Sequence, residues 1–165
     1  MFRLMNLPTR ALTAMLLSIA FAMPAGHAAR SSDAAHSTEM ASIDHVLGTW
    51  STQDGHGVIA IEQCGDALCG RIVGIDREPS EPMPTDVHGA PQCGLTIISK
   101  ERPTGDGSWL GEVTDPRTGK VYGALIWIDQ TGNLRLRGFL GLPLLGQTQT
   151  WHRFTGHLTS TCGLA

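Results

Sequence analysis

The side chains of this 165-residue chain that are suited to catalysis are few, and their spacing matches no specific catalytic motif. Asp54 and His56, and likewise Asp86 and His88, place a carboxylate two residues from an imidazole, a combination used in general acid–base catalysis. Both pairs lie beside glycine in sequences typical of turns, where sequence neighbours need not face each other. The sequence also lacks a Gly-x-Ser-x-Gly nucleophile motif and a phosphate-binding glycine loop. We therefore predict no catalytic residues and no enzymatic activity.

The four cysteines are candidates for either disulfide bonds or a metal site. Zinc sites typically contain Cys-x2-Cys pairs or paired histidines, whereas Cys64 and Cys69 are four residues apart with no matching second pair. Four cysteines allow three connectivities. We favour Cys64–Cys69, which flank one tight turn, and hence Cys93–Cys162. The sequence thus predicts disulfides, no bound metal and no cofactor.

A ligand-binding site is a second chemical possibility. The chain has four tryptophans but only one tyrosine, and large indoles in a small domain form either its core or the wall of a ligand cavity. Polar side chains within strands either fix the strand register or hold the polar head of a ligand at a cavity mouth. The candidate ligand-binding residues are Arg71, Trp109, Tyr122, Trp127 and Arg137.

Charge and the first residues restrict the partners and the compartment. With 12 Lys+Arg against 15 Asp+Glu and no basic cluster, binding to nucleic acid is not expected. Two arginines precede an apolar run over 11–23 and then small residues, which predicts a signal peptide over 1–28, cleaved after Ala28. The run is too short to span a bilayer, so we expect no membrane span in the mature form and a periplasmic or secreted protein.

The remaining chain has the pattern of a small all-β domain. Residues 29–42 are small and polar, which predicts a flexible leader, and 43–165 are predicted to form one domain. Within it, short apolar segments alternate with turns rich in Gly, Asp, Asn and Pro, and the 20 glycines fit many such turns. The predicted strands cover residues 48–53, 57–63, 68–75, 95–100, 109–114, 120–128, 134–140 and 148–154.

Eight strands in short hairpins favour an up-and-down antiparallel barrel, because closure leaves no edge strand unpaired. A two-sheet sandwich is the alternative. Alternation in Leu134-Arg135-Leu136-Arg137 predicts a half-buried strand. Residues 76–91 hold four of the nine prolines, so we expect a long surface loop there.

Several short motifs resemble known families. A Gly-x-Trp on the first strand and an Arg on the last are similar to the lipocalin and calycin group. Across 47–154 the chain resembles the exported bacterial family called domain of unknown function 2147. The matching pieces include Gly48-Thr49-Trp50, Cys69-Gly70-Arg71-Ile72, Pro91-Gln92-Cys93-Gly94-Leu95, Trp109-Leu110-Gly111, Leu136-Arg137-Gly138-Phe139-Leu140-Gly141 and Trp151-His152-Arg153.

The resemblance implies a lipocalin-like barrel in which Arg153 packs on Trp50 and closes one end. It supplies no catalytic residues. We therefore expect an exported binding protein for a small, mostly apolar ligand. The alternative is a periplasmic interaction or envelope-maintenance module with a filled barrel, which would bind an envelope protein partner through loop 76–91.

Overall fold

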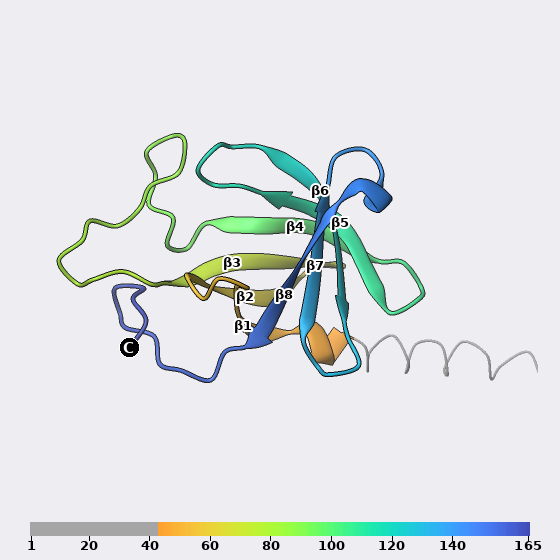
Figure 1. Cartoon of the computed structure of the whole chain (residues 1–165), viewed down its shortest axis with the longest axis horizontal. Coiled ribbons are helices and arrows are strands. Elements are labelled where there is room, and N and C mark those ends of the chain that lie inside the picture. Colours follow the sequence, from red (N-terminus) through yellow and green to blue (C-terminus); the bar gives the residue numbers. More distant parts are fainter. Residues whose placement is uncertain (1–42) are drawn as a thin grey trace, which may run out of the picture.

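The computed structural model describes residues 43–165, so the predicted signal peptide (1–28) and leader (29–42) lie outside the described residues. Eight antiparallel strands form a closed barrel in which each strand pairs with the next and β8 pairs with β1 (Figure 1). The predicted eight-stranded up-and-down barrel is thereby confirmed. The elements are β1 (Gly48–Ser51), β2 (Gly57–Cys64), β3 (Ala67–Ile75), β4 (Thr96–Pro103), β5 (Ser108–Thr114), β6 (Val121–Ile128), β7 (Leu134–Phe139), a 3-10 helix η1 (Pro143–Leu145) and β8 (Gln147–Arg153).

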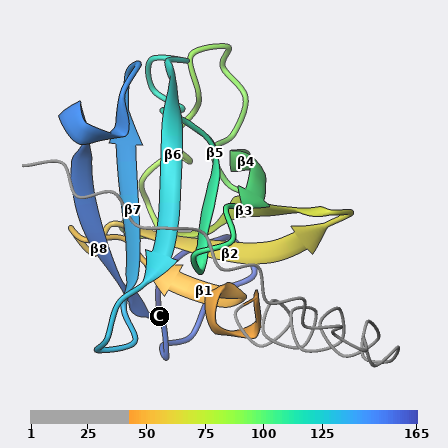
Figure 2. The same ribbon diagram turned by 90° about the vertical axis from the view of Figure 1, so that its right-hand side faces the viewer.

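The up-and-down order determines which loops lie together. The connections β1–β2, β3–β4, β5–β6 and β7–β8 fall at one end of the barrel, and the others fall at the opposite end. In Figure 2 three of the first set lie at the top of the view, at one end of the barrel: the loop after β3, the β5–β6 loop and the β7–β8 connection. We call this end the open end and the opposite one the closed end.

Inward side chains fill the closed end. The alternation predicted for β7 is confirmed, since Leu134 and Leu136 are buried while the arginines between and after them are half-buried. Trp50, Leu68 and Trp109 are also buried and belong to one hydrophobic cluster. Because such side chains stack in layers inside a narrow barrel, this end forms a packed core.

Arg153 closes the barrel at this end. Its guanidinium carbon lies 3.8 Å from the centroid of the Trp50 ring. Its Nη1 donates to the carbonyl of Leu47 at 2.6 Å and its Nη2 to that of His45 at 2.9 Å. Gly48 has φ +115°, and a Cβ there would lie 2.6 Å from Arg153 Nη1. The Gly-x-Trp motif is therefore explained by the space and backbone conformation that the arginine requires.

A bulge in β4 places a carboxyl group in the core. Lys100 and Glu101 together oppose Gly111 on β5, and Lys100 has φ 61°. Glu101 is fully buried, and neither of its carboxyl oxygens has a hydrogen-bond partner among residues 43–165. A Cβ on Gly111 would lie 2.7 Å from Glu101 Cδ, so this glycine makes room for the carboxyl. Burial, and secondarily the charge of Glu112, raise the pKa of Glu101 to about 9.

Two disulfides constrain the connections. Cys64–Cys69 spans the β2–β3 turn, with 5.9 Å between the Cα atoms, and Cys93–Cys162 ties the long β3–β4 loop to the carboxyl tail. Both predicted pairings are confirmed. The predicted loop over 76–91 contains no strand, only an isolated bridge between Thr85 and Pro91. No helix within 43–165 is long and apolar enough to cross a membrane.

The buried Glu101 carboxyl predicts a characteristic pH dependence of stability. Its pKa is about 9 when folded, against an ordinary 4.5, so the folded state retains a proton that the unfolded state loses. This contribution to the free energy of unfolding is present below pH 4.5 and falls by up to about 1.4 kcal/mol per pH unit between about pH 5 and 9. In urea titrations at pH 5, 7 and 9, Glu101→Gln should flatten this decline, whereas the exposed control Glu62→Gln should follow the wild type. Equal slopes for wild type and Glu101→Gln would contradict the assignment.

Arg153→Ala should weaken the closure of the barrel. The substitution removes the cation–π contact with Trp50 and two charge-assisted hydrogen bonds, with an expected loss of about 1–3 kcal/mol in the free energy of unfolding by urea titration. The control is Arg102→Ala, which removes an arginine whose ion pair with Asp66 is exposed and which should change stability little. Equal losses in the free energy of unfolding for Arg153→Ala and Arg102→Ala would contradict this role of Arg153.

Candidate functional site

The open end of the barrel contains a cavity of about 550 Å³. Loops β1–β2, β3–β4 and β5–β6 surround its mouth, and inward side chains of the strands form its wall. Most of the wall is apolar: it includes Ile59, Ile72, Ile97, Val113, Leu136 and Trp151. The volume and the apolar wall are typical of sites that hold one small molecule.

Polar side chains interrupt this apolar wall, among them Tyr122 and Gln149. Tyr122 on β6 is half-buried, and its hydroxyl makes no hydrogen bond within residues 43–165. Gln149 on β8 accepts a hydrogen bond from the indole Nε1 of Trp151 at 2.8 Å, which fixes its amide. Both residues line the cavity, and among the described residues no hydrogen-bond partner occupies the Tyr122 hydroxyl or the Gln149 amide nitrogen.

The rim carries more acid than base. Asp54, Asp76 and Asp115 line it together with His56 and Arg117. His56 Nδ1 lies 3.2 Å from Asp76 Oδ2, and Arg117 Nε lies 3.7 Å from Asp115 Oδ1. A hydrogen bond from the Thr52 hydroxyl holds the pKa of Asp54 below its ordinary value. With three carboxyl groups against one guanidinium and one imidazole, the mouth is acidic.

The aromatic candidates occupy three different environments. Tyr122 lines the cavity as its sequence position suggested. Trp109 points inward but is buried in the core toward the closed end, and it does not line the cavity. Trp127 follows the inward-facing Ile126 on β6, so alternation places its half-buried indole on the outer face of the barrel. The structure therefore brings only one of the three aromatic candidates to the cavity.

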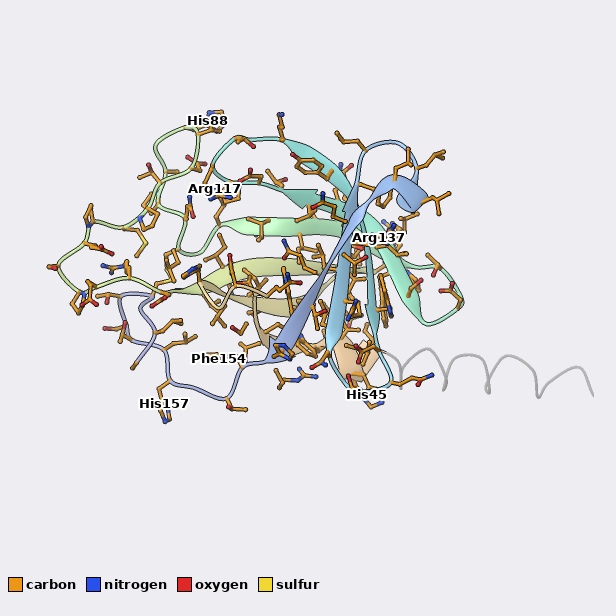
Figure 3. The ribbon with its side chains drawn as sticks, viewed as in Figure 1. His45, His88, Arg117, Arg137, Phe154 and His157 are labelled. Atoms are coloured by element: carbon orange, nitrogen blue, oxygen red, sulfur yellow. A yellow bond between two sulfur atoms is a disulfide. The ribbon has the colours of Figure 1, made fainter. Side chains whose placement is uncertain are left out.

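The two arginine candidates lie outside the barrel. Arg71 Nη2 donates to Glu62 Oε1 at 3.1 Å on the exposed surface of β2 and β3. Arg137 donates through Nε to the carbonyl of Pro143 at 2.5 Å and through Nη2 to that of Leu144 at 2.9 Å. In Figure 3 its label lies beside the β7–β8 connection, well apart from Arg117 on the rim. Neither arginine lines the cavity, so neither provides a cation for an acidic ligand there.

The acid and imidazole pairs of the sequence serve turns. Asp86 Oδ1 accepts the backbone N–H groups of His88 and Ala90, each at 2.8 Å, and Asp54 Oδ1 accepts that of His56. These contacts stabilise loop backbone and bring no imidazole onto the carboxylate two residues before it. Within the described part of the chain, no group of three or more His, Cys, Asp or Glu side chains is arranged to hold a metal ion.

Sequence reasoning missed most of the cavity wall. Ile97, Val113 and Gln149 were not singled out, since strand alternation identifies two faces but not the depth of a residue inside the barrel. One signal was present: each lies in a strand within a few residues of an open-end connection. Once the up-and-down order of the strands is known, inward-facing residues near the open-end connections are predicted to form the cavity wall.

The fold has a counterpart among solved structures. Protein HP1028 of Helicobacter pylori, described as belonging to the lipocalin family, superposes with a TM-score of 0.57 at 16% sequence identity. The match covers 66% of this chain and 82% of that one. At this identity the likeness concerns the fold alone, which is lipocalin-like as predicted.

Comparison with sequence families gives the affiliation. Among curated proteins, no match was found. The model of the family DUF2147, described as "uncharacterized protein conserved in bacteria", matches residues 48–153, which run from the glycine beneath Arg153 to Arg153 itself. This match spans well over half of the chain and the whole barrel, from β1 to β8. The chain therefore belongs to the bacterial family DUF2147.

Proposed function

We propose that this protein is an exported binding protein that holds one small, mostly apolar molecule in the cavity at the open end of the barrel. The observation that carries the proposal is the cavity of about 550 Å³ with its apolar wall. This volume lies above the roughly 300 Å³ at which small-molecule sites begin. An apolar ligand would release ordered water from that wall, and this burial would provide most of its affinity.

The polar groups of the cavity and its rim suggest the chemistry of the ligand's head group. Tyr122 and Gln149 offer hydrogen bonds within the cavity, and the rim beyond them is acidic. A carboxylate or phosphate head would be repelled by Asp54, Asp76 and Asp115, with Arg117 already close to the last of these. We infer that the head group of the ligand is uncharged or basic.

Export is part of the proposal. Two disulfides in a chain of this size suit an oxidising compartment, and the composition of residues 1–28 is that of a signal peptide. We therefore infer a periplasmic or secreted protein. We also infer a non-enzymatic role, because the lining presents hydroxyl and amide groups, carboxylates and the His56 imidazole beside Asp76, without an activated nucleophile among them.

The alternative function has less support. An interaction module acting through loop 76–91 was expected to have a filled barrel, and the barrel is filled only at its closed end. The loop itself contributes Asp76 and Pro84 to the lining of the cavity, so its position agrees with a role in the mouth. No contact of the loop favours a protein partner over this role.

Filling the cavity should abolish binding. Val113 lines the wall, whereas Val121, at the start of the next strand, is 51% exposed on the outside. With the neutral fluorescent probe N-phenyl-1-naphthylamine, Val113→Trp should weaken binding by about tenfold or more, while Val121→Trp should bind as the wild type does. Native mass spectrometry of protein purified from its own host should show a bound small molecule that Val113→Trp lacks. Unchanged probe affinity in Val113→Trp, or no binding by the wild type, would refute the proposed function.

The Tyr122 hydroxyl should contribute to the selection of a polar head group. A long-chain alcohol such as 1-nonanol should displace the probe from the wild type, and Tyr122→Phe should weaken this competition by about 2- to 10-fold through loss of one hydrogen bond. Affinity for the hydrocarbon-like probe itself should stay unchanged. If both affinities fell together, Tyr122 would be shaping the cavity rather than binding the head group.

A further inference from the structure

The β7–β8 connection exposes an unusual cluster of leucines. Leu140, Leu142, Leu144 and Leu145 are 68%, 64%, 82% and 76% exposed, and we call residues 140–145 the leucine tip. No charged residue occurs between Arg137 and His152. Single exposed leucines are ordinary on a protein surface, but four within six residues, without a charge among them, mark a surface that meets an apolar partner.

The base of the leucine tip is firmly packed, so the exposure does not reflect a loose loop. Arg137 binds the carbonyls of Pro143 and Leu144 and also donates through Nη1 to the Thr148 hydroxyl at 2.9 Å. Phe139 is only 9% exposed and covers Gly123, where a Cβ would lie 2.5 Å from the phenyl ring. These contacts hold the backbone against the outer wall of the barrel and direct the leucines outward.

Part of the backbone of the leucine tip is hydrogen-bonded within the β7–β8 connection. The N–H groups of Leu142, Leu145 and Gly146 donate to carbonyls within the connection at 3.0 to 3.1 Å, and Pro143 has no N–H. The guanidinium of Arg137 donates a second hydrogen bond to the carbonyl of Pro143 and also binds the carbonyl of Leu144. Water does not require such pairing, but a hydrocarbon environment does, because each unpaired backbone group carried into it costs several kcal/mol.

We propose that the leucine tip inserts into the interfacial region of a lipid bilayer. Protein–protein interfaces concentrate Trp, Tyr and Arg anchors within a rim of polar groups, whereas the tip offers only leucine, glycine and proline, and the donors of Arg137 serve carbonyls of its own loop. A protruding apolar tip with a partly paired backbone is suited to the interfacial region of a bilayer. Because the tip has no charge, its insertion depends on neither anionic lipid nor low salt.

The position of the leucine tip gives the insertion a consequence. The β7–β8 connection lies at the same end of the barrel as the loops around the cavity mouth (Figure 2). Insertion therefore holds the open end of the barrel near the bilayer, where an apolar molecule would exchange between cavity and membrane. Only this consequence rests on the proposed binding function. The insertion itself is independent of that function. Because only four leucines take part, it is weak and reversible.

Phosphatidylcholine vesicles test the proposal directly. In flotation assays with increasing lipid, the double variant Leu144→Glu/Leu145→Glu should lose about tenfold or more of the wild-type partitioning. The matched control is Leu110→Glu, a leucine 45% exposed on the outer face of β5, which should float as the wild type does. Any contribution of residues 1–42 is common to all three proteins. Equal flotation of the double variant and the wild type would overturn the proposal.

A tryptophan placed at the leucine tip locates the contact. Leu144→Trp should show fluorescence that is quenched by vesicles containing brominated lipid, in excess of the quenching of the wild-type protein with its four tryptophans. No excess quenching would overturn the proposal. Light scattering tests the alternative that the tip binds a second copy of the chain. A dimeric wild type and a monomeric double variant, with flotation of neither protein, would favour that alternative. Unchanged probe affinity in the double variant would show that the cavity and the tip act separately.

Discussion

The packing of the Arg153 guanidinium on Trp50 is the contact on which the closed barrel depends. β1 and β8 share only two register pairs, the shortest seam in the sheet, so backbone hydrogen bonds alone hold it weakly. The side chains strengthen it: Arg153 reaches the carbonyls that precede β1, and the Trp50 indole donates to the carbonyl of Val46 at 2.8 Å. These contacts join the first and last strands of the barrel, so that neither leaves an exposed edge at which other chains could pair.

Closure at one end allows a cavity at the other. Large side chains such as Trp50 and Trp109 fill the closed end, so the inward residues near the opposite loops need not meet across the barrel. Glycines adjust the packing between these regions. A Cβ on Gly70 would lie 2.9 Å from Ile98, and one on Gly111 would lie 2.7 Å from the Glu101 carboxyl. The strand glycines thus give room to side chains of neighbouring strands, a role as definite as any bending of the sheet.

The sequence predicted the fold better than the site, for a physical reason. Turn residues and alternation are local signals, so all eight strands were found, with β4 ending three residues later than expected. The bulge at Lys100 is the cause: this non-glycine residue has positive φ and lets the strand continue with Glu101 inward. Alternation along a strand distinguishes its two faces. Whether the face with Arg71 points into the barrel, and how far from the open end Trp109 lies, depend on strand register and on the packing of the core. Register and packing are long-range properties. Of the five candidate ligand-binding residues, Tyr122 alone lines the cavity.

The acidity of the cavity mouth follows from turn chemistry. Asp54 and Asp115 each accept backbone N–H groups of their own turns, so these carboxylates are required where the chain reverses, whatever the ligand. A rim fixed in this way can exclude anions, but it cannot distinguish one neutral molecule from another. For the ligand proposed above, discrimination would come from residues that no turn constrains, and these include the wall positions Val113, Tyr122 and Gln149. In the proposed binding function, selectivity among uncharged ligands would therefore depend on the inward faces of the strands, while the loops would set only the sign of the charge that the mouth accepts.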